Sequence, residues 1–309
     1  MKHKMDLSIV IVNWNTRDLL RNCLASIADT LTDLEYEVFV VDNASRDDSV
    51  AMVREQFTSV IVIANETNLG FAAANNLAFR QMQGRYALLL NSDTVLTDHA
   101  VATLSRFMED NSDVGMCCGQ LLNADGSRQN SIANFPSVWP LLCNETILRL
   151  LFPAQFPSKH QMHTAPVEVD SCIGACLLVR KAAMDQEGLL DEAFFFYFEE
   201  TDWAYRFKRA GWRICLVPQA RIYHLQGKSV GYSARARIMF HRSRSIYFKK
   251  WHPGQHGLMV SVIFVRTVIN IILNLVGGIC TVGLHRGIRQ RLAVNAQLAW
   301  WYLRGCPAA

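Results

Sequence analysis

Acidic residues are absent from the last third of the chain. All 27 Asp and Glu residues lie at or before Asp202, together with 14 of the 31 Lys and Arg residues, so residues 1–202 carry a net charge of −13. The remaining 107 residues carry 17 Lys and Arg and therefore a net charge of +17. This separation of charge indicates an anionic partner for the C-terminal third, either membrane lipid or nucleic acid.

Cysteine pairs with metal-site spacing are also absent. The nine cysteines form no Cys-x-x-Cys pair, and nine is an odd number. Neither a zinc site nor a disulfide framework is therefore indicated, and a reducing compartment that faces the cytosol fits best.

The N-terminus has too little apolar sequence for a secretory signal. Lys2 and Lys4 precede an apolar run at 7–12, but this run is shorter than the hydrophobic region of a signal peptide and ends in Asn13-Trp14-Asn15. We therefore interpret residues 7–13 as the first strand of the fold.

Two familiar phosphate-binding patterns are missing as well. The stretch 65–76 places Gly70 between a predicted strand and a predicted helix, where glycine permits a positive φ and a close backbone approach to a phosphate. The stretch contains neither GxGxxG nor GxxxxGK[ST], so a dinucleotide site or a P-loop is not supported. A simple turn explains Gly70 equally well.

Short apolar runs alternate with amphipathic stretches in the first 120 residues. Strands are predicted at 7–13, 37–41, 59–64 and 86–91, and helices at 17–30, from about 47, and at 71–83. This alternation is typical of right-handed βαβ units. The predicted fold class is therefore α/β, with a Rossmann-like, mostly parallel sheet and helices on both faces.

The pattern is looser after residue 120. Residues 120–166 hold five of the eight prolines, which indicates a long loop with short helices. An apolar run at 167–180 is interrupted at Gly174-Ala175, and a helix is predicted at 199–210. Two short strands are then expected at 212–217 and 220–223.

The C-terminal part combines basic and apolar helices. A basic helix is predicted at 233–251, Pro253-Gly254 breaks it, a mostly apolar stretch covers 258–284, and a second basic helix is predicted at 285–304. The apolar stretch is long enough to cross a bilayer, but Arg266 interrupts it and Lys or Arg flank both ends. We expect a helix or helical hairpin that lies in or dips into the cytoplasmic leaflet, with a single crossing as the alternative.

Two carboxylates follow directly after predicted strands. Asp93 ends the run 86–91 and Asp42 ends the run 37–41, so both belong at the carboxyl edge of a parallel sheet, where ligands bind. Asp93 can be a ligand of Mg²⁺ or Mn²⁺, and Asp42 can recognise a nucleotide. Either one can equally be a helix cap or a turn former.

A second acidic cluster, Glu199, Glu200 and Asp202, opens the helix predicted at 199–210. Acids are stabilised at a helix N-terminus by about 0.3–1 kcal/mol each, which is the purely structural explanation. Asp202 can also pair with Arg206 at i,i+4, while Glu200 lies on another face and stays available as a general base. His224 ends a predicted strand before 227–229 (Gly-Lys-Ser); a lone His is usually structural, but it can complete the shell of an oxygen-ligated metal.

Seven segments together resemble glycosyltransferase family 2, most of all its bacterial rhamnosyltransferase-like members. In chain order they are SIVIVNWN, VVDNAS, NLGFAAANN, LLLNSDT, IGACLLVRK, FFFYFEETDWAYRFKRAGW and IYHLQGKS, within residues 6–250. The resemblance implies a GT-A fold. It implies a catalytic domain at 1–230, with a nucleotide-binding half at 1–120 and an acceptor half at 121–230, followed by a membrane-associated region at 231–309.

The resemblance also implies roles for individual residues. Asn91-Ser92-Asp93 stands at the DxD-like metal motif, with Asn91 in place of its first acid, and His224 stands where the family can have a metal-binding histidine. Glu199-Glu200 matches an acidic pair usually written Glu-Asp, whose second member is the base, and Asp202 is the rival. The residues implied to bind the nucleotide sugar are Val12, Asn13, Asp42, Asn68, Gly70, Asn75, Ser92, Asp93, Gly174 and Ala175.

The activity implied is inverting transfer of rhamnose or a related hexose, in bacterial cell-surface glycan synthesis. The donor would be a dTDP- or UDP-linked sugar, the acceptor a lipid-linked or polysaccharide glycan, and the cofactor Mg²⁺ or Mn²⁺. The basic C-terminal region would meet an anionic membrane at the cytoplasmic face of the inner membrane, with no nucleic acid involved.

Two other classes of function remain open from the sequence. One is a nucleic-acid-binding α/β protein that uses the arginines of 235–250, although such a protein does not need the apolar stretch 258–284. The other is a catalytically inactive scaffold, which the presence of Asp93 and of the acid pair disfavours.

Overall fold

The computed structural model describes residues 5–32, 34–153, 155–158, 162–225, 233–280 and 285–306. Lys2, Lys4, the segment 227–229 and the predicted boundary between residues 230 and 231 lie outside these ranges. The described chain divides into two compact units. The first contains residues up to 135, 158–195 and 199–229, and the second contains 136–157, 196–198 and 230–309.

The first unit is built on the predicted parallel strands. Four strands lie side by side in the order β3-β2-β1-β4, and each neighbouring pair is parallel. Their bounds are β1 (Met5–Asn13), β2 (Tyr36–Asp42), β3 (Ile61–Ala64) and β4 (Gly84–Asn91), and the helices between them are α1 (Arg17–Thr30), α2 (Ser49–Gln56) and α3 (Phe71–Phe79). The prediction of βαβ units is confirmed here.

The rest of the sheet mixes directions. It continues from β4 through β10 (Cys176–Arg180), β6 (Val114–Leu122) and β11 (Arg213–His224) to β5 (Thr94–Leu96), and β8 (Val167–Glu168) also pairs with β11. The pair β6–β11 is parallel, whereas β10 is antiparallel to both of its neighbours and β5 is antiparallel to β11. The mostly parallel α/β sheet is confirmed, with β10 as an antiparallel insertion.

One strand prediction was wrong in detail. The pair expected at 212–217 and 220–223 is one strand, β11, whose register shifts between Val217 and Arg221. Pro218 lies in this interval, and because proline has no backbone N–H to donate, an irregularity of the pairing accommodates it without ending the strand. The run 167–180 is divided into β8, β9 (Ser171–Cys172) and β10.

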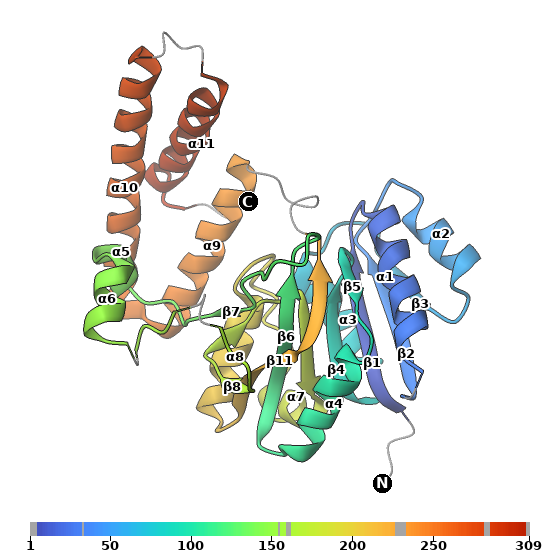
Figure 1. The fold of residues 1–309 in the computed structure, drawn as a ribbon. Helices are drawn as coiled ribbons and strands as arrows, with labels where there is room; N and C mark the ends of the chain where they lie inside the picture. Colours follow the sequence, from blue (N-terminus) through green and yellow to red (C-terminus); the bar gives the residue numbers. More distant parts are fainter. Residues whose placement is uncertain are drawn as a thin grey trace. The chain divides into compact units, whose positions relative to one another are not determined.

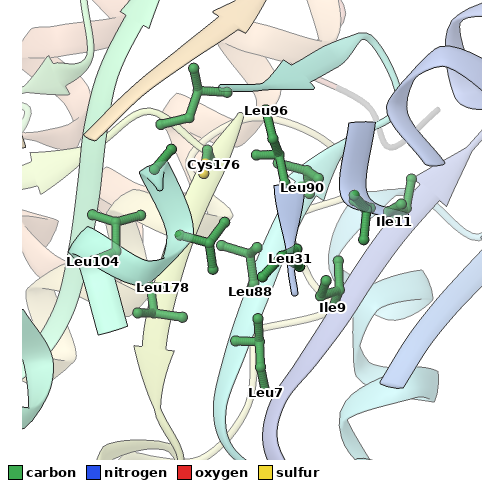
Figure 2. Close-up of a cluster of buried hydrophobic side chains, with 14 of the residues drawn as sticks. Leu7, Ile9, Ile11, Leu31, Leu88, Leu90, Leu96, Leu104, Cys176 and Leu178 are labelled. Atoms are coloured by element: carbon green, nitrogen blue, oxygen red, sulfur yellow. The ribbon is translucent and has the colours of Figure 1, made fainter. Parts of the chain in front are cut away.

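Helices cover both faces of the sheet (Figure 1). On one face, α1 and α4 (Ala100–Asp110) pack on alternating apolar residues of the strands, which is the cluster drawn in Figure 2. On the other face lie α3, which contacts β1 and β2, and α7 (Lys181–Glu187), which contacts β4 and β10. The buried residues labelled in the close-up are Leu7, Ile9, Ile11, Leu31, Leu88, Leu90, Leu96, Leu104, Cys176 and Leu178.

The remaining helices and strands are short, except for helix α8. Helix α8 (Glu199–Arg209) carries the second acidic cluster at its start and contacts β9 and β11. Residues 120–166 contain only β7 (Ile132–Ala133), α5 (Trp139–Leu142) and α6 (Glu145–Leu151) as helices or strands within the described part, besides the end of β6. This agrees with the loop and short helices that the prolines predicted.

The second unit contains three long helices: α9 (Ala234–Trp251), α10 (Pro253–Cys280) and α11 (Arg286–Leu303). Helices α10 and α11 run antiparallel as a hairpin (Figure 1), with Gly277 near Ile288 at one end and Phe264 near Tyr302 towards the other. Among the described residues, α10 is the one helix that is long and apolar enough to cross a membrane, over Pro253–Ile279. Only 17% of the most apolar stretch of this helix is buried. The predicted break at Pro253 and the apolar helix are both observed.

Gly70 provides a test of the fold at the start of α3. Its φ is +84°, and a Cβ there would lie 2.8 Å from Cδ2 of Phe195 and against the Phe195 carbonyl, to which the Phe71 N–H donates at 2.7 Å. We expect Gly70→Ala to lower the free energy of unfolding by about 3 kcal/mol, measured by urea denaturation. Gly126 is the matched control, because its φ is +80° but a Cβ added there would have no atom within 4 Å.

The control variant Gly126→Ala should lose only about 1 kcal/mol, the cost of the positive φ alone. Equal losses in the two variants would show that the approach of Phe195 to Gly70 contributes nothing to stability.

Candidate active site

The carboxyl ends of β1, β2 and β4 are joined by a chain of hydrogen bonds. Asn13 Nδ2 donates to Asp42 Oδ1 at 2.8 Å, so Asn13 Oδ1 faces Thr16 and accepts its hydroxyl proton at 2.6 Å. The hydroxyls of Thr16 and Ser92 are 2.7 Å apart, and since the Thr16 proton is already used, Ser92 donates. Three sequence-predicted residues, Asn13, Asp42 and Ser92, are therefore brought together.

Asp42 has a structural partner as well as a site-facing position. Its Oδ2 accepts the backbone N–H of Ser45 at 2.8 Å, and the residue is only 2% exposed. The turn-forming explanation of Asp42 is thus correct, and the carboxylate is held rigidly at the sheet edge. Val12, one residue before Asn13, is partly exposed and pairs in register with Val41 on one side and Asn91 on the other.

The stretch around Gly70 is organised by internal contacts. Asn68 Oδ1 accepts the N–H of Gly70 at 2.9 Å, and Asn43 Nδ2 donates to the Gly70 carbonyl at 3.1 Å. The close backbone approach that glycine permits here is to Phe195, so the packing of Gly70 is explained without a phosphate. Asn75 is fully buried inside α3, where its Nδ2 donates to the Phe71 carbonyl at 2.8 Å.

Asp93 and His224 face each other in the turn between β4 and β5 and at the end of β11. His224 Nε2 lies 3.3 Å from Asp93 Oδ1, and both residues are buried. The backbones are joined too, because Leu225 N–H donates to the Asp93 carbonyl at 2.9 Å and His224 pairs in register with Thr94. Two residues far apart in the sequence are thus locked side by side.

Gln129 determines which nitrogen of His224 is free. Its Nε2 donates to the backbone carbonyl of His224, which leaves Oε1 to face Nδ1 of the same ring at 3.0 Å. Nδ1 must therefore carry a proton, and Nε2, the nitrogen on the Asp93 side, is the one available to bind a metal. A histidine held in this way has the arrangement of a metal ligand supported by a hydrogen bond on its other nitrogen.

The Asp93–His224 pair fits an octahedral divalent cation. Two ligand atoms at about 2.1 Å from a metal and at right angles are about 3.0 Å apart, close to the observed 3.3 Å. Asn91 Nδ2 lies 3.5 Å from His224 Nε2, so this amide also borders the position. The described residues contain no cluster of three or more His, Cys, Asp or Glu suited to a metal, and the remaining ligands would have to be water and substrate phosphate.

The segment Gly174-Ala175 connects this edge of the sheet to the acidic cluster of α8. The Ala175 carbonyl accepts the N–H of Asn91 at 2.9 Å, two residues from Asp93. A Cβ on Gly174 would meet Cγ of Glu200 at 3.8 Å, in ordinary contact. The same two-residue segment therefore contacts both halves of the predicted site.

The two glutamates at the start of α8 have raised pKa values. Burial raises the pKa of Glu200 to about 7, while backbone N–H groups at the helix start oppose the shift. Burial, and then the charge of Glu200, raise the pKa of Glu199 well above its ordinary value. Oε2 of Glu199 has no hydrogen-bond partner among the described residues, as expected for a carboxyl that stays protonated. Glu200, which is partly exposed, titrates near neutral pH.

Asp202 is fully buried and bound within the protein. Its Oδ2 accepts from Arg206 Nε at 3.0 Å. The same guanidinium donates to the carbonyls of Glu187 and Leu189, which ties the start of α8 to the segment after α7. Asp202 therefore stabilises the local fold, and of the two rival bases only Glu200 is open to a proton from a substrate.

Two residues of this site, Gln129 and Thr16, were not predicted as site residues from the sequence. Gln129 lies in an irregular polar stretch with no periodicity, so no local pattern points to it. Thr16 stands at the cap position before α1, but its side chain makes no cap bond and joins Asn13 to Ser92.

Known proteins give an independent comparison. The chain is 25% identical over 272 residues to N-acetylglucosaminyl-diphospho-decaprenol L-rhamnosyltransferase of Mycobacterium tuberculosis, covering 80% of this chain and 85% of that protein. A mannosyltransferase of Pyrobaculum calidifontis, solved with GDP-Man and Mn²⁺, superposes with a TM-score of 0.57 at 15% identity, covering 98% of this chain and 87% of its own.

A second solved structure is similar over part of its length. GalNAc-T7, solved with UDP, GalNAc and Mn²⁺, superposes with a TM-score of 0.58 at 15% identity, covering 79% of this chain and 48% of its own. These superpositions confirm the GT-A fold expected from the sequence. The glycosyl transferase family 2 model matches residues 8–188, more than half of the chain, and the protein therefore belongs to glycosyl transferase family 2.

Proposed function

We propose that the protein is an inverting glycosyltransferase that moves rhamnose or a related hexose from a nucleoside-diphosphate sugar to a lipid-linked or polysaccharide acceptor in bacterial cell-surface glycan synthesis. The observation that carries this proposal is the environment of Glu200. Its carboxyl has a pKa of about 7 and lies beside Gly174, and the residue is partly exposed, while its neighbour Asp202 is fully buried and bound to Arg206.

Glu200 acts as the general base. It takes the proton of an acceptor hydroxyl as that oxygen forms a bond to the anomeric carbon, and the bond from this carbon to the diphosphate oxygen breaks on the opposite side. The nucleoside diphosphate leaves with the electron pair of the broken bond, and the configuration inverts. A base with a pKa near the working pH is partly deprotonated and still accepts a proton effectively.

The diphosphate of the donor is held at the carboxyl ends of the strands. Asp93 and His224 would hold Mg²⁺ or Mn²⁺, which stabilises the negative charge that grows on the leaving group. Asp42, fixed by Asn13 and Ser45, is placed to bind the nucleoside, and Gly174-Ala175 borders the sugar. The mycobacterial relative is named for rhamnosyl transfer to N-acetylglucosaminyl-diphospho-decaprenol, which supports rhamnose as the sugar. Our first choice of donor is dTDP-linked rhamnose, and our second is a UDP-linked hexose.

We place the protein at the cytoplasmic face of the inner membrane. Support comes from the long apolar helix α10, from the excess of basic residues after Asp202, and from the diphospho-decaprenol in the name of the relative. Arg266 lies at the middle of the candidate span, where a charge is costly in a bilayer. An α10–α11 hairpin that dips into one leaflet avoids this cost.

The base assignment predicts a pH profile. We expect Glu200→Gln to reduce kcat by at least about 10³-fold without changing the affinity for the nucleotide, because proton removal is lost and the binding contacts remain. In the wild type, kcat/KM should fall about tenfold per pH unit below pH 7, where Glu200 becomes protonated. The assay is a panel of dTDP- and UDP-sugars offered with lipid-linked acceptors and Mg²⁺ or Mn²⁺.

Asp202→Asn is the matched control for Glu200→Gln. It should lower the free energy of unfolding by about 3 kcal/mol, since it leaves Arg206 without its carboxylate, yet keep the wild-type pH profile in the folded fraction. If Asp202→Asn no longer showed the fall of kcat/KM below pH 7, and Glu200→Gln turned over normally, Asp202 would be the general base instead of Glu200.

The raised pKa of Glu200 also predicts a gain in stability on its removal. Because the folded pKa of about 7 exceeds the ordinary value of 4.5, the folded protein binds this proton more tightly than the unfolded chain does. The contribution of Glu200 is thus fully present below pH 4.5 and lost as pH rises through 7. We expect inactive Glu200→Gln to be about 1–3 kcal/mol more stable than wild type at about pH 8 and equal at about pH 4, by urea denaturation. No difference at the higher pH would refute a raised pKa.

Gln129 supplies a test of the metal assignment that does not depend on turnover. Gln129→Leu removes the group that fixes the proton on Nδ1 of His224, and we expect Mn²⁺ to bind about tenfold more weakly in the presence of UDP, measured by electron paramagnetic resonance. His224→Ala should weaken Mn²⁺ further. Unchanged Mn²⁺ affinity in both variants would remove His224 from the metal site.

A further inference from the structure

The second unit has almost no acidic residues to neutralise its arginines. Its sequence, 136–157, 196–198 and 230–309, contains one carboxylate side chain, Glu145, and this residue pairs with Arg149 at 2.7 Å on the short helix α6. Arg244 of α9 and Arg266 of α10 therefore have no carboxylate side chain within their own unit with which to pair.

Two arginines and a histidine lie on one face of α9. Arg237, His241 and Arg244 are spaced i, i+4 and i+7, so their side chains leave the helix in the same direction. Arg235 and Arg242 belong to the opposite face by the same geometry. The guanidinium of Arg244 is partly buried and lies over the ring of Phe240, 4.8 Å from its centroid.

Helices α10 and α11 add to this face of α9. The hydroxyl of Tyr302 on α11 is 3.0 Å from Nδ1 of His241, and the ring of Tyr302 lies 6.4 Å from that of Phe264 on α10. Arg266 follows Phe264 on α10 by two residues, in the part of α10 that packs against Tyr302. Arg237 and Arg244 thus share the face of α9 that carries the Tyr–His pair, and Arg266 lies two residues from the α10 ring that packs on the same tyrosine.

This gathering of positive charge is unfavourable by itself. Burial, and then the charges of Arg237 and Arg266, lower the pKa of Arg244, although an arginine remains charged. Burial, and then Arg244 and Arg237, lower the pKa of His241 to about 3, so the ring is neutral and adds no further charge. A bound anion would relieve the repulsion and would stabilise this arrangement of helices.

An exposed apolar stripe begins beside Arg266. Val265 and Ile269 adjoin it on α10, and exposed apolar residues continue along the helix to Ile279. The helix from Arg266 to Ile279 spans about 20 Å, which is less than the roughly 30 Å of a bilayer core. If the part of α10 from Arg266 to Ile279 enters the membrane from one side, with Ile279 deepest, Arg266 lies at the depth of the head groups. The expected ligand is therefore a phosphate carried on a long apolar chain.

We propose that Arg237, Arg244 and Arg266 bind the diphosphate of the lipid-linked acceptor, with its polyprenyl chain along the apolar stripe of α10. A sugar-diphosphate-lipid carries one negative charge on each phosphate, and guanidinium groups match phosphate oxygens in pairs of hydrogen bonds. A common anionic phospholipid presents a single phosphate to the same three arginines. This inference rests on the proposed function, which it deepens by locating the acceptor.

The test compares vesicles of equal charge. Wild-type protein is mixed at physiological salt with phosphatidylcholine vesicles that contain either decaprenyl diphosphate or enough phosphatidylglycerol to match its total charge, and binding is measured by flotation. We expect at least about tenfold tighter binding to the diphosphate vesicles. Equal binding to both would show a general attraction to anionic membranes and would overturn the proposal.

Single substitutions test whether the three arginines cause the preference for diphosphate vesicles. Arg244→Gln, and separately Arg266→Gln on the exposed side, should each reduce the preference for diphosphate about tenfold, while Arg235→Gln on the opposite face of α9 should keep it. Arg266→Gln decides the matter if Arg244→Gln does not fold. An equal preference in Arg266→Gln and Arg235→Gln would refute the site.

An assay of sugar transfer distinguishes failure of the anion site from failure of the proposed glycosyltransferase function. If wild type prefers the diphosphate vesicles in an Arg244-dependent way but no nucleotide sugar supports transfer, the proposed function fails and the anion site stands. If transfer to a lipid-linked acceptor occurs with the same KM in wild type, Arg244→Gln and Arg266→Gln, the function stands and the anion site fails.

Discussion

The parallel register of β1, β2 and β4 is the constraint on which the donor half of the site depends. It sets Asn13 opposite Asp42 and Val12 opposite Asn91, so the polar residues that end these strands meet at one edge. Hydrogen bonds from Ser92 through Thr16 and Asn13 to Asp42 then fix their orientation. A shift of one residue in any pairing would turn these side chains to the opposite face of the sheet and break this chain of hydrogen bonds.

Much of this could be predicted, because the information is local. An apolar run that ends at or just before Asn13, Asp42 or Asp93 specifies both a strand and the polar group at its end, and the alternation with helices specifies parallel pairing. The antiparallel insertion of β10 and the continuity of β11 past Pro218 could not be predicted, because they depend on pairing between distant segments. Gln129 was missed for the same reason, as its role exists only once β11 brings His224 beside it.

The acidic cluster shows how surroundings give different roles to neighbouring carboxylates. Asp202 has Arg206 one helical turn away and forms an ion pair with it, as the i,i+4 spacing predicted. Glu200 is held beside Gly174 at the start of the same helix, and there burial dominates and raises its pKa. Protonated Glu199 removes one of the two like charges. The carboxylate that we propose as the base is thus one whose charged form the fold destabilises without keeping it protonated at neutral pH, and its removal is expected to trade activity for stability.

The separation of charge along the chain has a structural consequence for the second unit. Helices α9, α10 and α11 pack around aromatic rings and a neutral His241, and they contain no carboxylate side chain that could compensate Arg244. An Asp or Glu in place of Arg237, His241 or Ser245 on α9 could pair with Arg244 and stabilise the unit, but its negative charge would also repel a phosphate. The absence of acids therefore agrees with the anion site that we propose at Arg244 and Arg266, and with that site an anion from outside would stabilise the unit.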